Sequence, residues 1–182
     1  MDYDLILAVP TVEHEQQAIN LIDEASATDI DPEMRFAGFA NLAEYRDNYL
    51  GWLDLLKAHA YEETLPVGRV PASTFFSVRK SDGKVVGIID IRHRLNDYLL
   101  NYAGHIGYTI LPSERRNCYG YQQLMLALDF CKSIGINRVL ITCADDNVAS
   151  AKTIEKAGGV LENKILNTEN GRCVRRYWVD AK

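Results

Sequence analysis

The chain has 182 residues and a formal net charge of −5, and 47% of its residues are hydrophobic. This length supplies one well-filled core and is too short for two ordinary domains, so we expect a single domain over residues 1–182. The acidic balance argues against nucleic acid as a partner and is compatible with a cationic amine as substrate.

Neither a membrane partner nor a signal peptide is expected. The sequence has no apolar run of about 18 residues, and its first residues, Met-Asp-Tyr-Asp-Leu, lack a positively charged segment. We therefore expect a cytoplasmic protein. The four cysteines form no CxxC pair, so neither disulfide bonds nor a metal site is expected; they are Cys118, Cys131, Cys143 and Cys173.

The first elements along the chain are a strand, a helix and an irregular loop. Residues 5–9 predict a short apolar strand that Pro10 ends, and Thr11 is placed to cap a helix with an apolar face through Ala25. Residues 28–39 then break every periodicity. This loop mixes aromatic residues with three carboxylates, Asp29, Asp31 and Glu33.

A second helix is predicted next. Asn41 followed by Glu44 is a capping-box pattern, and apolar residues continue at helical spacing over 42–56. We interpret this aromatic stripe as core or dimer contact rather than as a ligand platform. Residues 62–72 contain Pro66, Gly68 and Pro71 and predict a loop.

A β-hairpin follows this loop. Residues 74–79 and 84–92 flank Ser81-Asp82-Gly83, which is a strong hairpin signal. Asp90 and His93 lie at the end of the second strand, where a further loop leads towards His105.

The next stretch predicts a strand, a turn and a helix. Residues 105–111 alternate as a strand does, Pro112 ends the run, and apolar residues recur at helical spacing over 124–131. The intervening turn carries Arg115 and Arg116 at the start of the helix. Backbone N–H groups, the helix dipole and two guanidiniums together favour an anion such as a phosphate or pyrophosphate.

The remaining elements continue the alternation. Residues 138–143 predict a buried strand, Asn147 caps a helix that ends at Gly158-Gly159, and residues 160–166 and 172–179 predict two strands joined by a hairpin turn. The strand–helix–strand order indicates an α/β arrangement with two parallel neighbouring strands.

These residues resemble the GCN5-related N-acetyltransferases (GNAT). The family signature is Arg or Gln, two variable residues, Gly, one variable residue, then Gly or Ala, and Arg115 to Gly120 match it with Cys118 in place of the first glycine. Residues 146–158 are similar to the family's fourth helix. Gly104 to Tyr108 and Arg175 to Trp178 are similar to a bacterial branch of the family. The resemblance is close over residues 104–165 and rests elsewhere on element order.

The resemblance implies the α+β acyl-CoA N-acyltransferase fold, a mixed sheet of about six or seven strands flanked by about four helices. It also implies transfer of an acetyl group from acetyl-CoA, without a metal, to a primary amine of a small molecule or peptide. A homodimer is implied by family habit alone. The runner-up is a non-catalytic acyl-CoA-binding or regulatory domain, because Cys118 replaces a signature glycine and Ile154 stands where many members carry a tyrosine general acid. A nucleotide-binding α/β protein is disfavoured, since neither GxGxxG nor GxxxxGK[ST] is present.

The resemblance also implies the residues that bind acetyl-CoA. The pyrophosphate is expected on a loop that comprises Arg115, Arg116, Asn117, Cys118, Tyr119, Gly120 and Tyr121. The pantetheine chain is expected beside Ile110, Leu111, Asn147 and Ser150. A non-glycine residue at position 118 costs roughly 1 kcal/mol if its φ is positive.

Proton transfer is expected to involve a histidine and a tyrosine. An alkylamine is almost fully protonated at neutral pH, and His105 has the best intrinsic pKa for accepting its proton. Tyr108, or alternatively Tyr121, would replace the missing tyrosine as proton donor. Carboxylates compete with His105 for the base role, and the acceptor amine is expected near Asp29, Asp31, Glu33, Asp90 and His93.

Overall fold

The computed structural model describes residues 3–28 and 36–181. Its centre is a mixed seven-stranded sheet with the strand order β1-β2-β3-β4-β5-β7-β6. Only β4 and β5 run parallel; the other neighbouring pairs are antiparallel. The strands are β1 (Leu5–Ala8), β2 (Ala72–Arg79), β3 (Val85–Arg92), β4 (Ile106–Ile110), β5 (Arg138–Ala144), β6 (Val160–Asn167) and β7 (Arg172–Asp180). The predicted strands and the predicted parallel pair are confirmed.

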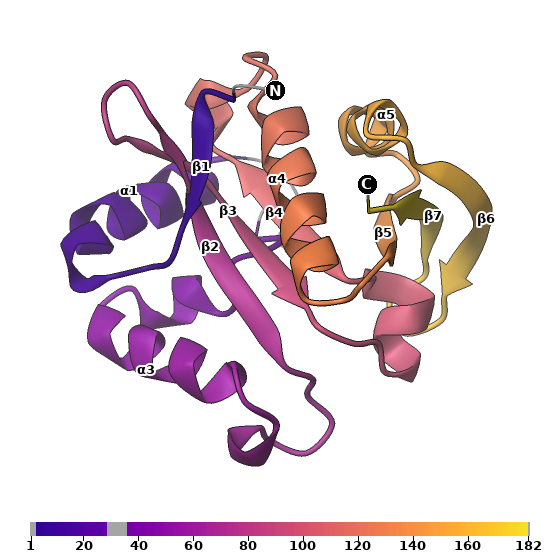
Figure 1. Ribbon diagram of the computed structural model, residues 1–182, viewed down its shortest axis with the longest axis horizontal. Coiled ribbons are helices and arrows are strands. Elements are labelled where there is room, and N and C mark those ends of the chain that lie inside the picture. Colours follow the sequence, from indigo (N-terminus) through magenta and orange to yellow (C-terminus); the bar gives the residue numbers. More distant parts are fainter. Residues whose placement is uncertain (1–2, 29–35, 182) are drawn as a thin grey trace.

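Helices cover both faces of the sheet (Figure 1). The α-helices of the described residues are α1 (Glu15–Ser26), α3 (Tyr49–His59), α4 (Tyr119–Ser133) and α5 (Val148–Lys156). Short helical turns are η1 (Val12–His14), η2 (Leu42–Tyr45), η3 (Glu62–Thr64), η4 (Leu99–Ala103) and η5 (Pro112–Glu114). Within residues 3–28 and 36–181, every helix is too short or too polar to span a membrane.

Alternation along β3 divides the core between the two faces. Ile88 packs with residues of α1 and α3, whereas its neighbour Ile89 packs with residues of α4 and α5. Successive strand residues point to opposite faces, so this assignment extends along the strand. Asp90 and Arg92 therefore point to the α1 and α3 side.

The helix predicted over residues 42–56 is broken in two. Asn41 takes a left-handed conformation before η2, and its side-chain amide donates to Glu44 Oε1 instead of capping a long helix. A second start follows at Asn48, whose side chain accepts from the backbone N–H of Gly51 and begins α3. The interpretation of the aromatic stripe as core is confirmed for Trp52, which is fully buried and donates to the carbonyl of Ala40.

Residues 36–41, which lead into η2, form a loop that packs against β4. Thr109 Oγ1 donates to the carbonyl of Ala37 at 2.7 Å. Gly38 has a φ of 81° and lies so close to β4 that a Cβ on it would overlap the carbonyl of Gly107. A residue without a side chain is therefore required here, and the loop forms a wall beside the middle of β4.

Candidate active site

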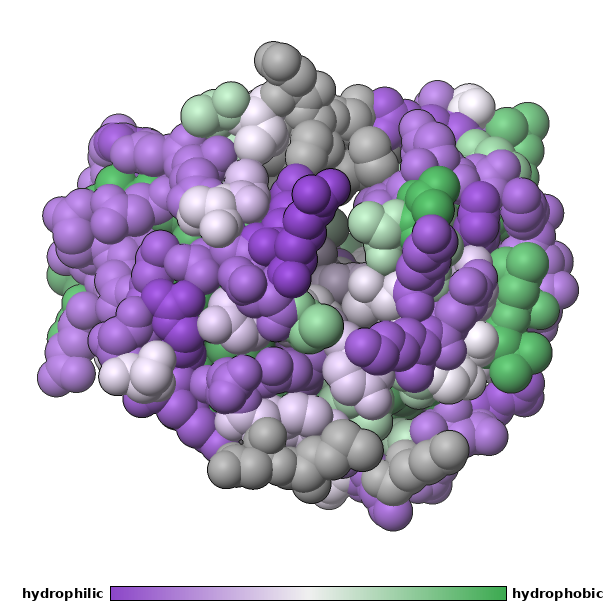
Figure 2. Space-filling view, turned by 90° about the horizontal axis from the view of Figure 1, so that it is seen from above, coloured by the Kyte–Doolittle hydropathy of each residue, from purple (hydrophilic) through white to green (hydrophobic). Residues whose placement is uncertain are grey.

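The parallel strands β4 and β5 separate soon after they meet. Their register links Ile106 with Ile141 and no later pair, although β4 continues to Ile110 and β5 to Ala144. A cleft of about 1770 Å³ lies here, lined by both strand ends, the 36–41 loop, the 115–121 turn and α5. Figure 2 views the molecule from the top of Figure 1. The surface is hollowed there, and strongly hydrophilic side chains lie at the rim of the hollow.

Most of the residues predicted to bind acetyl-CoA line this cleft. They are Ile110, Arg115, Arg116, Cys118, Tyr119, Gly120, Tyr121, Asn147 and Ser150. Two do not line it: Leu111 is buried in the core on the α1 side, and Asn117 donates its side-chain amide to the carbonyl of Glu114.

The turn before α4 has the geometry of an anion site. Arg116 and Cys118 have φ values of 69° and 59°, and the first backbone bond of α4 runs from Gln122 N–H to the carbonyl of Cys118. The N–H groups of Tyr119 and Gly120 come before that bond, at the positive end of the helix dipole. Arg115 and Arg116 precede them in the chain, are exposed and line the cleft, so positive charge and backbone donors occur in the same turn.

Cys118 has the left-handed backbone conformation whose cost the sequence analysis considered. Its left-handed φ is unfavourable for a residue with a Cβ, and most of all for a β-branched one. We expect Cys118→Val to lower the free energy of unfolding by about 1–2 kcal/mol, and Cys118→Gly to raise it by up to about 1 kcal/mol. Urea unfolding measures both. Cys173→Val, at a strand position without positive φ, is the control, and a Cys118→Val variant as stable as wild type would contradict the strain.

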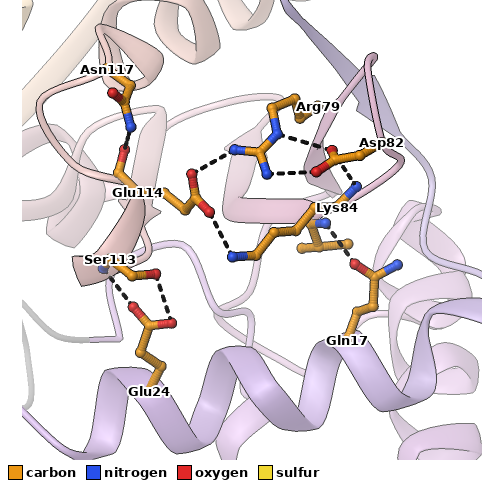
Figure 3. Close-up of polar contacts among 9 residues, drawn as sticks. Gln17, Glu24, Arg79, Asp82, Lys84, Ser113, Glu114 and Asn117 are labelled. Atoms are coloured by element: carbon orange, nitrogen blue, oxygen red, sulfur yellow. Dashed lines mark hydrogen bonds and ion pairs between the residues drawn. The ribbon is translucent and has the colours of Figure 1, made fainter.

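Ion pairs hold this turn against the β2–β3 hairpin (Figure 3). Glu114 lies between Arg79 and Lys84, with oxygen-to-nitrogen distances of 2.7 Å and 2.6 Å, and it is only 8% exposed. Ser113 is tied to α1, since its backbone N–H and hydroxyl both donate to Glu24. The hydrogen bond with Lys84 is the main cause that lowers the pKa of Glu114 below its usual value.

We expect Glu114→Gln to lower the free energy of unfolding by about 2 kcal/mol at pH 7, because charged hydrogen bonds are lost. Since the folded-state pKa is lowered, the carboxylate stabilises the fold fully above its unfolded value of 4.5, and this contribution is lost as the pH falls through the lower folded value. The difference from wild type should therefore shrink on acidification. Urea titrations at pH 7 and at acid pH measure it, with exposed Glu63→Gln as control. A difference that grows on acidification would contradict this linkage.

Next to this turn, a tyrosine of β4 and a serine of α5 form a pair. Asn147 caps α5 by accepting from the N–H of Ser150, and the Ser150 hydroxyl lies 2.9 Å from the Tyr108 hydroxyl. Burial raises the pKa of Tyr108 to about 12, so its hydroxyl stays protonated at neutral pH. Ile154, where the expected tyrosine is missing, is fully buried. A protonated hydroxyl therefore lines the cleft at Tyr108.

His105 does not line the cleft. Its Nδ1 accepts from the backbone N–H of Leu140 at 2.9 Å, which leaves the ring proton on Nε2. Its own N–H donates to the carbonyl of Leu140, and burial lowers the pKa of its imidazole to about 4. This geometry joins β4 to β5, and the base role predicted for His105 finds no support in it.

Of the predicted acceptor residues, the structure describes Asp90 and His93, and only Asp90 lines the cleft. Asp29, Asp31 and Glu33 lie outside the described residues. Asp90 lines the cleft, but it is 7% exposed and already pairs with Thr74 and Arg92. His93 does not line the cleft; its Nε2 lies 2.9 Å from Ser73 Oγ, and burial lowers the pKa of its imidazole.

His59 lines the cleft and was missed by the sequence reasoning. It ends α3, and of the four histidines it alone is among the lining residues. Burial, and then the charge of Arg69, lower the pKa of its imidazole, so it is neutral at pH 7. Its only sequence signal is a histidine in the last turn of a helix, a common feature. In the part of the chain that the structure describes, no cluster of side chains suited to a metal ion was found.

Solved acetyltransferase structures share this fold across nearly their whole length. A chimeric spermidine N-acetyltransferase from Vibrio cholerae is 14% identical, with a TM-score of 0.66, over 98% of this chain and 96% of that one. RimL, a ribosomal-protein alpha-N-acetyltransferase solved with coenzyme A, is 19% identical, with a TM-score of 0.68, over 100% of this chain and 97% of that one. A ribosomal-protein alanine acetyltransferase from Vibrio fischeri is 14% identical, with a TM-score of 0.66, over 100% of this chain and 96% of that one.

Curated proteins give no match to the chain. The family described as an acetyltransferase (GNAT) domain matches residues 23–160, which include the end of α1, the sheet from β2 through β5 and both walls of the cleft. The fold predicted from the sequence is therefore confirmed, and the chain belongs to the GNAT acetyltransferase family.

Proposed function

We propose that the protein transfers an acetyl group from acetyl-CoA to a primary amine of a small molecule or peptide, by direct attack of the amine on the thioester. One observation carries the proposal: the cleft between separated β4 and β5 ends at the anion-binding turn before α4. That turn would hold the pyrophosphate on its backbone N–H groups. Lys152 and Lys156 also line the cleft and add positive charge to the same wall.

The pantetheine arm would lie along the edge of β4 that turns away from β5. Past Ile106 this edge has no strand partner among the described residues, because β4 pairs with β3 on its other side and separates from β5. Unpaired backbone groups of a strand edge are able to bind an extended ligand. The thioester would then lie next to Tyr108.

Tyr108 would serve as the proton donor. When the amine nitrogen bonds to the carbonyl carbon and the carbon–sulfur bond breaks, the electron pair stays on sulfur, and the Tyr108 hydroxyl can protonate the thiolate. Ser150 orients this hydroxyl through the 2.9 Å contact. A thiolate leaves far more readily than an alkoxide, because a thiol is a much stronger acid than an alcohol. One positioned proton donor is therefore sufficient.

His59 would accept the proton that the amine loses. Its imidazole is neutral at pH 7, because burial and Arg69 lower its pKa, and a neutral imidazole is able to take a proton directly or through water. We propose His59 in place of His105 because His59 lines the cleft and His105 does not.

Two measurements on the purified protein test the proposal. Acetyl-CoA should raise the melting temperature, because a ligand that binds only the native state stabilises it. A thiol reagent should then detect free CoA when a panel of primary amines is added. Binding without turnover of any amine would favour the alternative, a non-catalytic acyl-CoA-binding or regulatory domain, which the residues Cys118 and Ile154 suggest. Neither binding nor turnover would overturn both.

The cytoplasmic location and the homodimer stay predictions. Sedimentation of the purified chain at micromolar concentration measures the oligomeric state directly.

A further inference from the structure

Basic side chains wall the part of the cleft on the α1 and α3 side of β4. Arg92 points to this side from the end of β3, and Asp90 lies two residues before it on the same face. The guanidinium of Arg92 lies over Gly107 of β4: a Cβ on Gly107 would be 3.3 Å from both Nη1 and Nη2. Its terminal nitrogens therefore face the place where β4 and β5 separate.

Asp90 positions this guanidinium, and each of its two carboxylate oxygens already has a partner. One carboxylate oxygen accepts from Thr74 Oγ1 at 2.9 Å, and the other lies 3.0 Å from Arg92 Nε. Arg92 Nη1 has a long contact of 3.5 Å with the carbonyl of Ala103, and Nη2 donates to no group of the described residues. A rigid fork of N–H donors is thus presented to the cleft.

A second arginine stands at the rim. Arg69 is exposed, lines the cleft and makes no ion pair within residues 3–28 and 36–181. Its charge lowers the pKa of the His59 imidazole while that of Asp90 raises it, so both charges lie within electrostatic reach of the imidazole. Among the described residues of this part of the cleft, Arg69 and Arg92 lie with two carboxylates that already accept hydrogen bonds, Asp90 and Glu44. The donors left for a ligand are therefore cationic, which favours an anionic group over a polycation.

We propose that the acceptor is an amine that also carries a carboxylate, such as a free amino acid, with the carboxylate bound by the fork of Arg92 and drawn in by Arg69. This inference rests on the proposed acetyl transfer and deepens it. Planar guanidinium and carboxylate groups pair through two parallel hydrogen bonds, which fix orientation as well as position. The amine would then point from Arg92 towards the thioester beside Tyr108, while neutral His59 adds no competing charge.

Matched acceptors test this on the wild-type enzyme. Each common amino acid is compared with its own carboxamide and with spermidine, and CoA release is followed. We expect kcat/KM for the preferred amino acid to exceed that for its carboxamide by at least about tenfold. A carboxamide or spermidine that is used equally well or better would overturn the inference while the acetyltransferase proposal stands. No binding of acetyl-CoA and no turnover would remove the proposed function and this inference together.

Variants locate the carboxylate. Arg92→Lys keeps a positive charge beside Asp90 but loses the fork, and Arg69→Gln removes the charge at the rim. Each should raise KM for the amino acid, by roughly tenfold for Arg92→Lys and by about threefold for Arg69→Gln, and leave KM for the carboxamide nearly unchanged. The control is Arg94→Gln, because Arg94 pairs with Glu62 and does not line the cleft. Thermal unfolding verifies that each variant is folded. If both variants still prefer the amino acid to its carboxamide as strongly as wild type does, the carboxylate does not bind at Arg92 and Arg69.

Discussion

Tyr108→Phe should lower kcat for acetyl transfer by on the order of 100-fold and leave the affinity for acetyl-CoA within about twofold. The change removes a hydroxyl and no other atom, so the ring continues to pack in the cleft. What is lost is the proton donor for the departing thiolate and the contact with Ser150 at 2.9 Å. Steady-state rates with the best amine, and acetyl-CoA binding by calorimetry, separate the two effects.

The pH dependence adds a second readout to this variant. Because burial raises the pKa of Tyr108 to about 12, its hydroxyl remains protonated, and the wild-type rate should show no fall from this group below about pH 10. Tyr45→Phe is the matched control, since Tyr45 packs in the α1 and α3 core and does not line the cleft. A kcat for Tyr108→Phe within about threefold of wild type would exclude the donor role.

Local sequence signals predicted most of the elements and the position of the basic turn before α4. The alternation in β4, the apolar spacing in α4 and the arginines between them depend on neighbours in the chain, and such patterns are visible without a fold. The same reasoning identified Cys118 as a residue that would be strained if its φ were positive, and its φ is 59°. The broken helix after Asn41 was not predicted, because a capping-box pattern cannot exclude a second start further along the chain at Asn48.

Contacts between distant residues could not be predicted in this way. The Tyr108–Ser150 pair joins residues 42 positions apart, and the bond that occupies His105 comes from Leu140, 35 positions away. Nothing in the alternation of β4 distinguishes an imidazole that faces a ligand from one that accepts a backbone N–H. Likewise, the sequence does not show that Asp90 pairs with Arg92 and Thr74, because Thr74 lies 16 positions away on the neighbouring strand. The chemistry of the site is therefore set by tertiary packing.

Gly38→Ala should be among the most destabilising single changes in the protein, lowering the free energy of unfolding by about 3 kcal/mol or more. Two costs combine. Gly38 has a φ of 81°, which a residue with a Cβ adopts at a cost of about 1–2 kcal/mol. In addition, the new Cβ would overlap the backbone of Gly107 and Tyr108 in β4, and backbone cannot rotate away as a side chain can.

Gly68→Ala separates these two costs. Gly68 has a similar φ of 85°, but no atom lies within 4 Å of the place of its Cβ. It should therefore lose only the conformational cost, about 1 kcal/mol, which corresponds to a fall in Tm of about 2–4 °C for a domain of this size. The larger loss in Gly38→Ala then measures the contact between the 36–41 loop and β4. Because that loop walls the cleft beside Gly107, Gly38→Ala should also raise KM for the amine more than KM for acetyl-CoA, whose predicted turn lies at the other end of β4. Equal stability losses in the two variants would show that the 36–41 loop can move away from β4. Other residues would then have to form the wall of the cleft beside the acceptor amine.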